Sequence, residues 1–405
     1  MIHDRIRRAR LLRGLSLEAL SQRLGDITKQ GLSKLEKGLI TPNSTRLLQL
    51  SDALDVSPEY FFRAEPLPLA PLEFRKLAKM PKYLQQQVQE QIREHLERYI
   101  ALEMYFDPAD IQTPTTPCQI YPVGSIEEAE VAAEQLRERW QIGLDAISNL
   151  TELFEENGIK VALLDGPEDF DGACAASCDN QHMLIALTAN RPGARMRCAA
   201  AHELGHWVMS LPEDMPEAEK ERCCHRFAGA FLYPASHVKG DFGTHQRTEV
   251  HPQELLIAKR QYGLSMQAVL FRLKDLALLS ADGYRHLTIQ FSMRGWRKAE
   301  PEPQACQSPQ RFESLVFWGL AEGLFTRSRA AELLNRTIDM LDRDRADMDA
   351  TLPALREMSP GCIPVELPIG TGPDLTGVID LIGMNATTYT DGPNGTVGEL
   401  PEERL

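Results

Sequence analysis

The chain has 405 residues and a formal net charge of −14, and 43% of its residues are hydrophobic. A chain of this length exceeds one compact core, so we expect roughly two to four domains in an ordinary globular protein. No run approaches the roughly 18 apolar residues of a membrane span, and the N-terminus lacks an apolar signal core, which predicts a cytoplasmic protein with no membrane partner. The eight scattered cysteines do not form the pattern of a disulfide framework.

The negative charge is unevenly distributed along the chain. Residues 1–63 contain 11 Lys and Arg against 7 Asp and Glu, whereas residues 342–405 contain 4 against 12. A basic head on an acidic protein favours an N-terminal module that faces nucleic acid.

The head is predicted to form short helices joined by tight turns. Gly14 and Gly25 are placed to end the first two helices, and Ser16 and Thr28 are placed to cap the second and the third. The third helix, over residues 29–37, carries small polar residues on its exposed side. This order predicts an all-α helix-turn-helix domain. A small helical bundle that contacts only proteins is the alternative.

Residues 15–21 and 28–38 closely resemble the Cro/C1-type (XRE) repressor family, and the resemblance covers nearly the whole module of residues 1–63. It implies that the third helix enters the major groove of a double-stranded DNA operator. The residues implied in DNA contact are Thr28, Lys29, Gln30, Ser33, Lys34 and Lys37. Gln30 would read an adenine edge, while Thr28 and Lys37 would bind phosphate. Gly31 departs from the family, because a side chain is usual at this position.

Residues 64–125 are predicted to connect the head to the rest of the chain. A Pro-spaced linker over residues 65–71 comes first. Apolar residues then recur at four-residue steps, which predicts an amphipathic helix over residues 81–104. This helix offers a packing or a dimerisation surface. Because regulators of this kind usually bind paired half-sites, we expect a homodimer.

Residues 199–207 read Ala-Ala-Ala-His-Glu-Leu-Gly-His-Trp, an H-E-x-x-H motif within an apolar helix former. Residues four apart share one face of a helix, so His202 and His206 can direct two imidazoles at one metal ion. Glu203 would lie beside the ion, where it could take a proton from a metal-bound water. The alternative is a solvated pair of histidines on an ordinary helix.

A domain over residues 126–280 is expected to surround this motif. Its predicted elements are helices over residues 126–140, 147–157 and 217–232, a strand over residues 159–164, and a hairpin of residues 172–176 with residues 182–187. The fold class we expect is therefore mainly α, with a small α+β zinc-peptidase-like domain behind the all-α helix-turn-helix domain.

Residues 185–187, Arg191-Pro192, the H-E-x-x-H motif and the run from Cys224 to Pro234 resemble the ImmA/IrrE metallopeptidase family. The resemblance is closest to members that are fused behind an XRE helix-turn-helix, and it covers roughly residues 75–338. It implies zinc as the cofactor, His202 and His206 as ligands, and Glu203 as the general base. The spacing of the motif assigns the same roles.

The third metal ligand stays open. In the peptidase members it is a Glu four residues before the Phe of a Phe-Ala step, and Cys223 stands at that position here. Glu219 lies one turn earlier on the same face, whereas Glu221 and His225 are expected on other faces unless the helix is rotated; all four residues stay candidates. In a further alternative, Cys223 is only a small buried residue and the site is degraded.

Residues 281–341 are predicted to pack on the preceding domain, with a strand-like stretch over residues 286–292 and a helical hairpin of residues 311–323 and 328–335. In the tail, residues 342–405, two apolar stretches (364–370 and 376–386) resemble part of the GTPase domain of elongation factor G. Because the chain lacks a G-x-x-x-x-G-K-[ST] loop, nucleotide hydrolysis is excluded. We expect a loosely packed fragment.

Two functions are compatible with these observations. In the first, a DNA-binding transcriptional regulator uses its zinc metallopeptidase-like domain to cleave a repressor or partner protein. In the second, that domain is a non-catalytic sensor of a ligand or partner. A third, a stand-alone peptidase that docks through its head, is disfavoured by the basic third helix.

Overall fold

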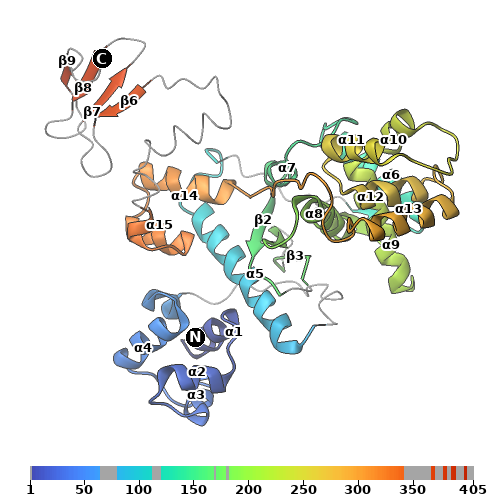
Figure 1. Ribbon diagram of the computed structural model, residues 1–405. Helices are drawn as coiled ribbons and strands as arrows, with labels where there is room; N and C mark the ends of the chain where they lie inside the picture. The colour runs from blue at the N-terminus through green and yellow to red at the C-terminus, as the bar shows by residue number, and fades with distance from the viewer. Residues whose placement is uncertain are drawn as a thin grey trace. The chain divides into compact units, whose positions relative to one another are not determined.

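The computed structural model describes residues 2–63, 80–111, 120–167, 170–178 and 182–341, together with four backbone strands between residues 366 and 398 (Figure 1). The Pro-spaced linker and residues 342–365 lie outside the described residues. The chain divides into two compact units, Met1–Leu315 and Val316–Leu405. None of the described helices combines the length and the apolar character that a membrane crossing requires.

The head forms a small helical domain. Its elements are α1 (Ile2–Leu12), α2 (Leu17–Leu24), α3 (Lys29–Glu36), α4 (Ser44–Leu54) and a 3₁₀ turn, η1 (Pro58–Phe62). As expected, the side chains of Ser16 and Thr28 accept hydrogen bonds from the first turns of α2 and α3. Leu20, Leu32 and Leu50 are fully buried in its core. The helix-turn-helix arrangement of α2 and α3 is thus confirmed.

Helix α5 (Lys82–Glu103) has two occupied faces. Its apolar residues Val88, Ile92 and Leu96 are fully buried in a cluster with the strands of the neighbouring sheet. On its acidic side, Arg8 donates to Glu90 at 2.8 Å and to Glu97 at 3.1 Å. The helix predicted from the four-residue steps is therefore a packing element within the chain.

The sheet that supports the motif helix has the strand order β2 (Ile159–Leu164), β4 (Met183–Thr188), β3 (Gly172–Ala176). β2 runs parallel to β4, and β3 runs antiparallel to it, which confirms the predicted hairpin. Both faces of the sheet are covered: Ala162 and Ala186 lie in the cluster with α5, and Val161 and Ile185 lie in the main core. This burial explains why the strands read as continuous apolar runs.

The remaining elements of the first unit described here share one hydrophobic core with the helix α8 (Gly193–Val208). They are α6 (Ile126–Arg139), α7 (Leu150–Glu156), α9 (Glu217–Leu232), α10 (Ala235–Phe242), α11 (Pro252–Tyr262), α12 (Met266–Asp275) and α13 (Ala281–Met293), with the short parallel pair β1 (Tyr121–Pro122) and β5 (Met209–Ser210). Arg272 of α12 donates to Glu130 of α6 at 2.7 Å, and Arg226 of α9 contacts the same carboxylate. These buried ion pairs fasten α9, which carries the second half of the site described below.

The strand expected over residues 286–292 is wrong, because these residues belong to α13. Ser280 caps this helix by accepting from the backbone N–H of Gly283. Leu287 and Phe291, four residues apart, are both buried in the main core. Burial at helical spacing outweighed the β propensity of the local Thr, Ile and Phe residues.

The last part of the chain contains a helical pair and a small sheet. α14 (Arg311–Ala321) spans the division between the two units, and α15 (Arg327–Leu334) follows it, as expected from the sequence. In the tail, β6 (Glu366–Ile369), β7 (Gly377–Asp380), β8 (Asn385–Thr388) and β9 (Thr396–Gly398) pair in sequence order, each antiparallel to the next. β6 lies within the first stretch singled out in the sequence, and β7 lies within the second.

Candidate metal centre and nucleic-acid interface

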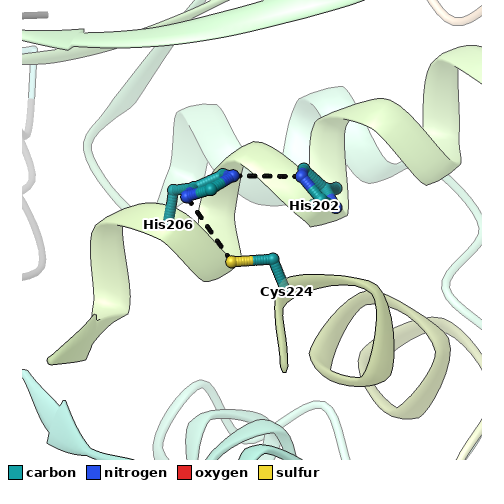
Figure 2. Close-up of side chains that lie close together, drawn as sticks. All are labelled: His202, His206 and Cys224. Carbon is teal, nitrogen blue, oxygen red and sulfur yellow. Dashed lines mark hydrogen bonds between the residues drawn. The ribbon is translucent and has the colours of Figure 1, made fainter. Parts of the chain in front are cut away.

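The two motif histidines lie on one face of α8 with their Nε2 atoms 3.0 Å apart (Figure 2). His202 is almost completely buried, and the two rings meet edge to face at 4.8 Å. The helix can carry them close to α9 because Gly205 lies between them: a Cβ at this position would lie only 3.0 Å from the ring of Phe227. The predicted pairing of His202 with His206 is therefore present.

Glu221 of α9 approaches both imidazoles. One carboxylate oxygen lies 3.3 Å from Nε2 of His202, and the other lies 3.4 Å from Nε2 of His206. Hydrogen bonds to His202 and His206 hold the pKa of the Glu221 carboxyl well below its usual range. Two imidazole nitrogens and a carboxylate thus converge on one point.

Two further donors on α9 complete the surroundings of the pair. The Sγ atom of Cys224 lies 3.5 Å from Nδ1 of His206 (Figure 2). The ring of His225 lies 4.4 Å from the ring of His202. The described residues contain two overlapping groups whose ligand atoms lie within 4.8 Å of one another: His202, His206 and Cys224, and His202, Glu221 and His225.

Neither Cys223 nor Glu219 belongs to these groups. α9 instead has the rotation that turns Glu221 and His225 toward the motif histidines. Cys223 is fully buried in the apolar core, and this burial raises the pKa of its thiol. The rotation of α9 about its axis is set by Phe227 and Phe231, which fill the core and stack on each other at 5.8 Å. That rotation brings Glu221 to the histidines. The spacing of the two phenylalanines marks the buried face of α9, but it does not show which helix lies against the face beside it.

Glu203 lies on α8 beside strand β3 and is only 5% exposed. A Cβ at Gly172 of β3 would lie 3.4 Å from the Cγ atom of Glu203 and 3.1 Å from the backbone oxygen of Ala186. The glycine therefore leaves room for the glutamate between helix and sheet. Like Gly205, Gly172 is needed for the packing of the site, and the sequence contains no sign of this.

A cavity of about 240 Å³ opens beside His206. Its other lining residues are Ile120, Met209, Ser210, Leu211, Glu217 and Lys220. A cavity lined by both apolar and charged side chains can accept a side chain or a small ligand next to the histidine.

The donor set fits zinc. Zinc is bound in proteins by imidazole nitrogen, carboxylate oxygen and thiolate sulfur, and two histidines with one carboxylate form a known set that leaves a position open. His202, His206 and Glu221 supply that set from the two packed helices.

The residues expected to contact DNA gather on and beside α3. Thr28, Lys29, Gln30, Lys34 and Lys37 are exposed and Ser33 is half-buried, whereas Leu32 and Leu35 of the same helix are buried. Lys29 also lies 3.5 Å from Glu18. A Cβ at Gly31 would lie 2.9 Å from Ile27, so close packing at the start of the helix accounts for the departure from the repressor pattern.

Comparison with known proteins identifies two separate parts of the chain. Residues 6–61 match the helix-turn-helix family, and residues 155–274 match the IrrE N-terminal-like domain. An uncharacterized HTH-type transcriptional regulator, y4aM, of Sinorhizobium fredii is 44% identical over 62 residues, which is 15% of this chain and 43% of that protein. Elongation factor G 2 of Streptomyces coelicolor is 43% identical over 56 residues, 14% of this chain and 8% of that protein. The chain thus spans less than half the length of either relative, and it combines an XRE-type helix-turn-helix with an IrrE-like domain.

Proposed function

We propose that this DNA-binding regulator holds zinc in its IrrE-like domain through His202, His206 and Glu221, and that the domain cleaves a repressor or partner protein. The observation that carries the proposal is the position of Glu221, whose two carboxylate oxygens lie 3.3 and 3.4 Å from the two histidines. Two histidines and a carboxylate are the ligand set of zinc peptidases whose site keeps a position open.

Each part of the site would have its own role in the hydrolysis of a peptide bond. Bound zinc would act as a Lewis acid that activates water and polarises a peptide carbonyl. Glu203 would accept the proton released during attack and pass it to the leaving amine. The cavity beside His206 would receive a side chain of the bound polypeptide.

The head directs this activity to DNA-bound targets. The exposed polar side of α3 presents Gln30 and Lys34 to the major groove of an operator, and Thr28 and Lys37 to its phosphates. We propose a homodimer that binds paired half-sites, because helix-turn-helix proteins commonly match their two-fold symmetry to that of the operator. The expected oligomer can be measured by light scattering after size-exclusion chromatography.

A non-catalytic sensor is the second candidate. Cys224 and His225 add two more potential ligands around the histidines. A zinc ion that is surrounded by four protein ligands has a structural role, because no position is left open for a substrate.

Metal analysis tests the site itself. We expect about one zinc per chain in the wild type and its loss in His202→Ala and Glu221→Ala. Cys223→Ala is the matched control: it removes a thiol two residues from Glu221 that points into the core, and it should retain zinc. A wild-type protein that binds no transition metal would contradict the proposal.

Cleavage is tested with Glu203→Gln, which should keep the metal because Glu203 is not one of the proposed ligands. New protein N-termini in cells that express the wild type are compared with those in cells that express the variant. Termini that appear only with the wild type support a peptidase. Identical sets with equal zinc content would favour the sensor.

A further inference from the structure

The two ring nitrogens of His206 face different partners. Nε2 points to the cluster, 3.0 Å from Nε2 of His202 and 3.4 Å from Glu221. Nδ1 points away from it, toward the Sγ atom of Cys224 at 3.5 Å (Figure 2). The imidazole is therefore held between a prospective metal position on one side and a thiol on the other.

The thiol is fixed in place by its surroundings. Cys224 is fully buried in the main core. It follows Glu221 by three residues, so both side chains project from neighbouring positions on one face of α9. The helix that supplies the carboxylate therefore also supplies the sulfur behind His206.

A histidine that binds a metal through Nε2 must be neutral and must carry its proton on Nδ1. Proteins usually give that N–H an acceptor, commonly a carboxylate or a backbone carbonyl, which fixes the tautomer and the orientation of the ring. Here the sulfur of Cys224 lies within reach of Nδ1, and a cysteine sulfur accepts hydrogen bonds weakly.

Coordination by this sulfur would require an ion bound at Nδ1 of His206, not at the Nε2 atom that faces His202 and Glu221. Nδ1 and Nε2 lie on different sides of the ring, so an ion bound to Nε2 of His206 lies away from the sulfur. Glu221, in contrast, contacts the Nε2 atoms of both histidines.

We propose that Cys224 is a positioning residue for the metal centre: it accepts the Nδ1–H of His206 and so directs Nε2 at the ion. This role rests on the zinc site proposed above. The adjacent Cys223 has no such role, because it remains in the apolar core.

Zinc affinity, measured by competition with a chromophoric chelator, separates the roles of the two adjacent cysteines. Cys224→Ala should lower the affinity by about 10–100-fold, the usual cost of losing the support of a metal-bound histidine. Cys224→Ser, whose hydroxyl can accept the same hydrogen bond, should recover part of that loss. Cys223→Ala should bind zinc as the wild type does.

Cobalt substitution distinguishes support from coordination in the wild-type chain, even if the alanine variant fails to fold. Cobalt bound by nitrogen and oxygen should give visible bands without a thiolate-to-cobalt charge-transfer band in the near ultraviolet. Such a band, lost in Cys224→Ser, would overturn the proposal by making Cys224 a ligand. Equal zinc affinity of the wild type and Cys224→Ala, with equal melting temperatures of the metal-free proteins, would overturn it as well. Absence of any metal in the wild type would instead contradict the site, and this role with it.

Discussion

Arg5 of α1 and Glu97 of α5 form an ion pair at 2.7 Å, with only 3% and 11% of the two side chains exposed. Arg8 joins the same carboxylate and Glu90, and Arg63 contacts Glu94 at 2.6 Å. The acidic side of α5 thus binds the head, while its apolar side packs on the sheet beneath α8. Helix α5 therefore contacts both the helix-turn-helix domain and the domain that carries the candidate metal centre.

Weakening this link should loosen the head. In Glu97→Gln, Arg5 and Arg8 lose the charge of a shared partner in a poorly hydrated interface. We expect the free energy of local opening of α1, measured by hydrogen exchange, to fall by about 1–3 kcal/mol. Glu18→Gln is the control, because its pair with Lys29 has side chains 60% and 61% exposed. It should cost about 0.5 kcal/mol or less, and an equal effect of both changes would contradict the role of the interface.

DNA binding should depend on the exposed side of α3. The double change Gln30→Ala with Lys34→Ala removes one base-reading amide and one cation from this surface, and should weaken binding about 10-fold or more. The measurement is a titration of operator fragments that the wild type selects from random DNA. Lys298→Ala, an exposed lysine outside the head, is the control. Unchanged affinity of the double variant, with an unchanged circular dichroism spectrum, would argue against this recognition helix.

Acid should destabilise the protein partly through His95. Burial, with a smaller contribution from Arg98, lowers the pKa of His95 from 6.5 to about 3. Since the unfolded chain then binds the proton more readily, stability is lost as the pH falls from about 6.5 toward 3, at up to about 1.4 kcal/mol per pH unit. Between pH 7 and pH 5, His95→Gln should show a smaller drop in melting temperature than the wild type. An equal drop in the wild type and in His95→Gln would contradict this contribution.

The first residue of α8 must be glycine for steric reasons. A Cβ at Gly193 would lie 2.2 Å from the backbone oxygen of Ala305, in a segment that also bonds to α11 and α12 through Glu300. The backbone at Ala305 can move away from an added Cβ only at a cost in free energy. Gly193→Ala should therefore lower the free energy of unfolding by about 1–3 kcal/mol. Gly240→Ala in α10 meets no atom within 4 Å and should raise it by about 0.5–1 kcal/mol. Urea unfolding compares the two, and a stabilising Gly193→Ala would show that the segment is not packed there.

Local patterns predicted most of the fold. Ser16 and Thr28 correctly predict the starts of two helices. The alternation of apolar runs with turn residues correctly predicts β2, β3 and β4. The strand predicted around Leu287 and Phe291 is wrong, because the neighbouring residues favour a strand whereas the structure has helix α13 there. The burial of these two residues, four apart, is what fits the helix. The dimer surface anticipated on α5 is occupied within the chain, by the sheet and by the arginines of α1.

The sequence alone determined the pair of His202 and His206, because four-residue spacing on a helix places two side chains together whatever surrounds them. It also determined the capped, polar-faced α3 of the DNA-binding head. Only the tertiary structure decided the rest of the metal centre. The close crossing of α8 and α9 at Gly205 and Phe227 rotates Glu221 and Cys224 toward the histidines and turns Cys223 into the core. The spacing of Phe227 and Phe231 marks the buried face of α9, but only the packing of two distant surfaces places α8 beside Glu221.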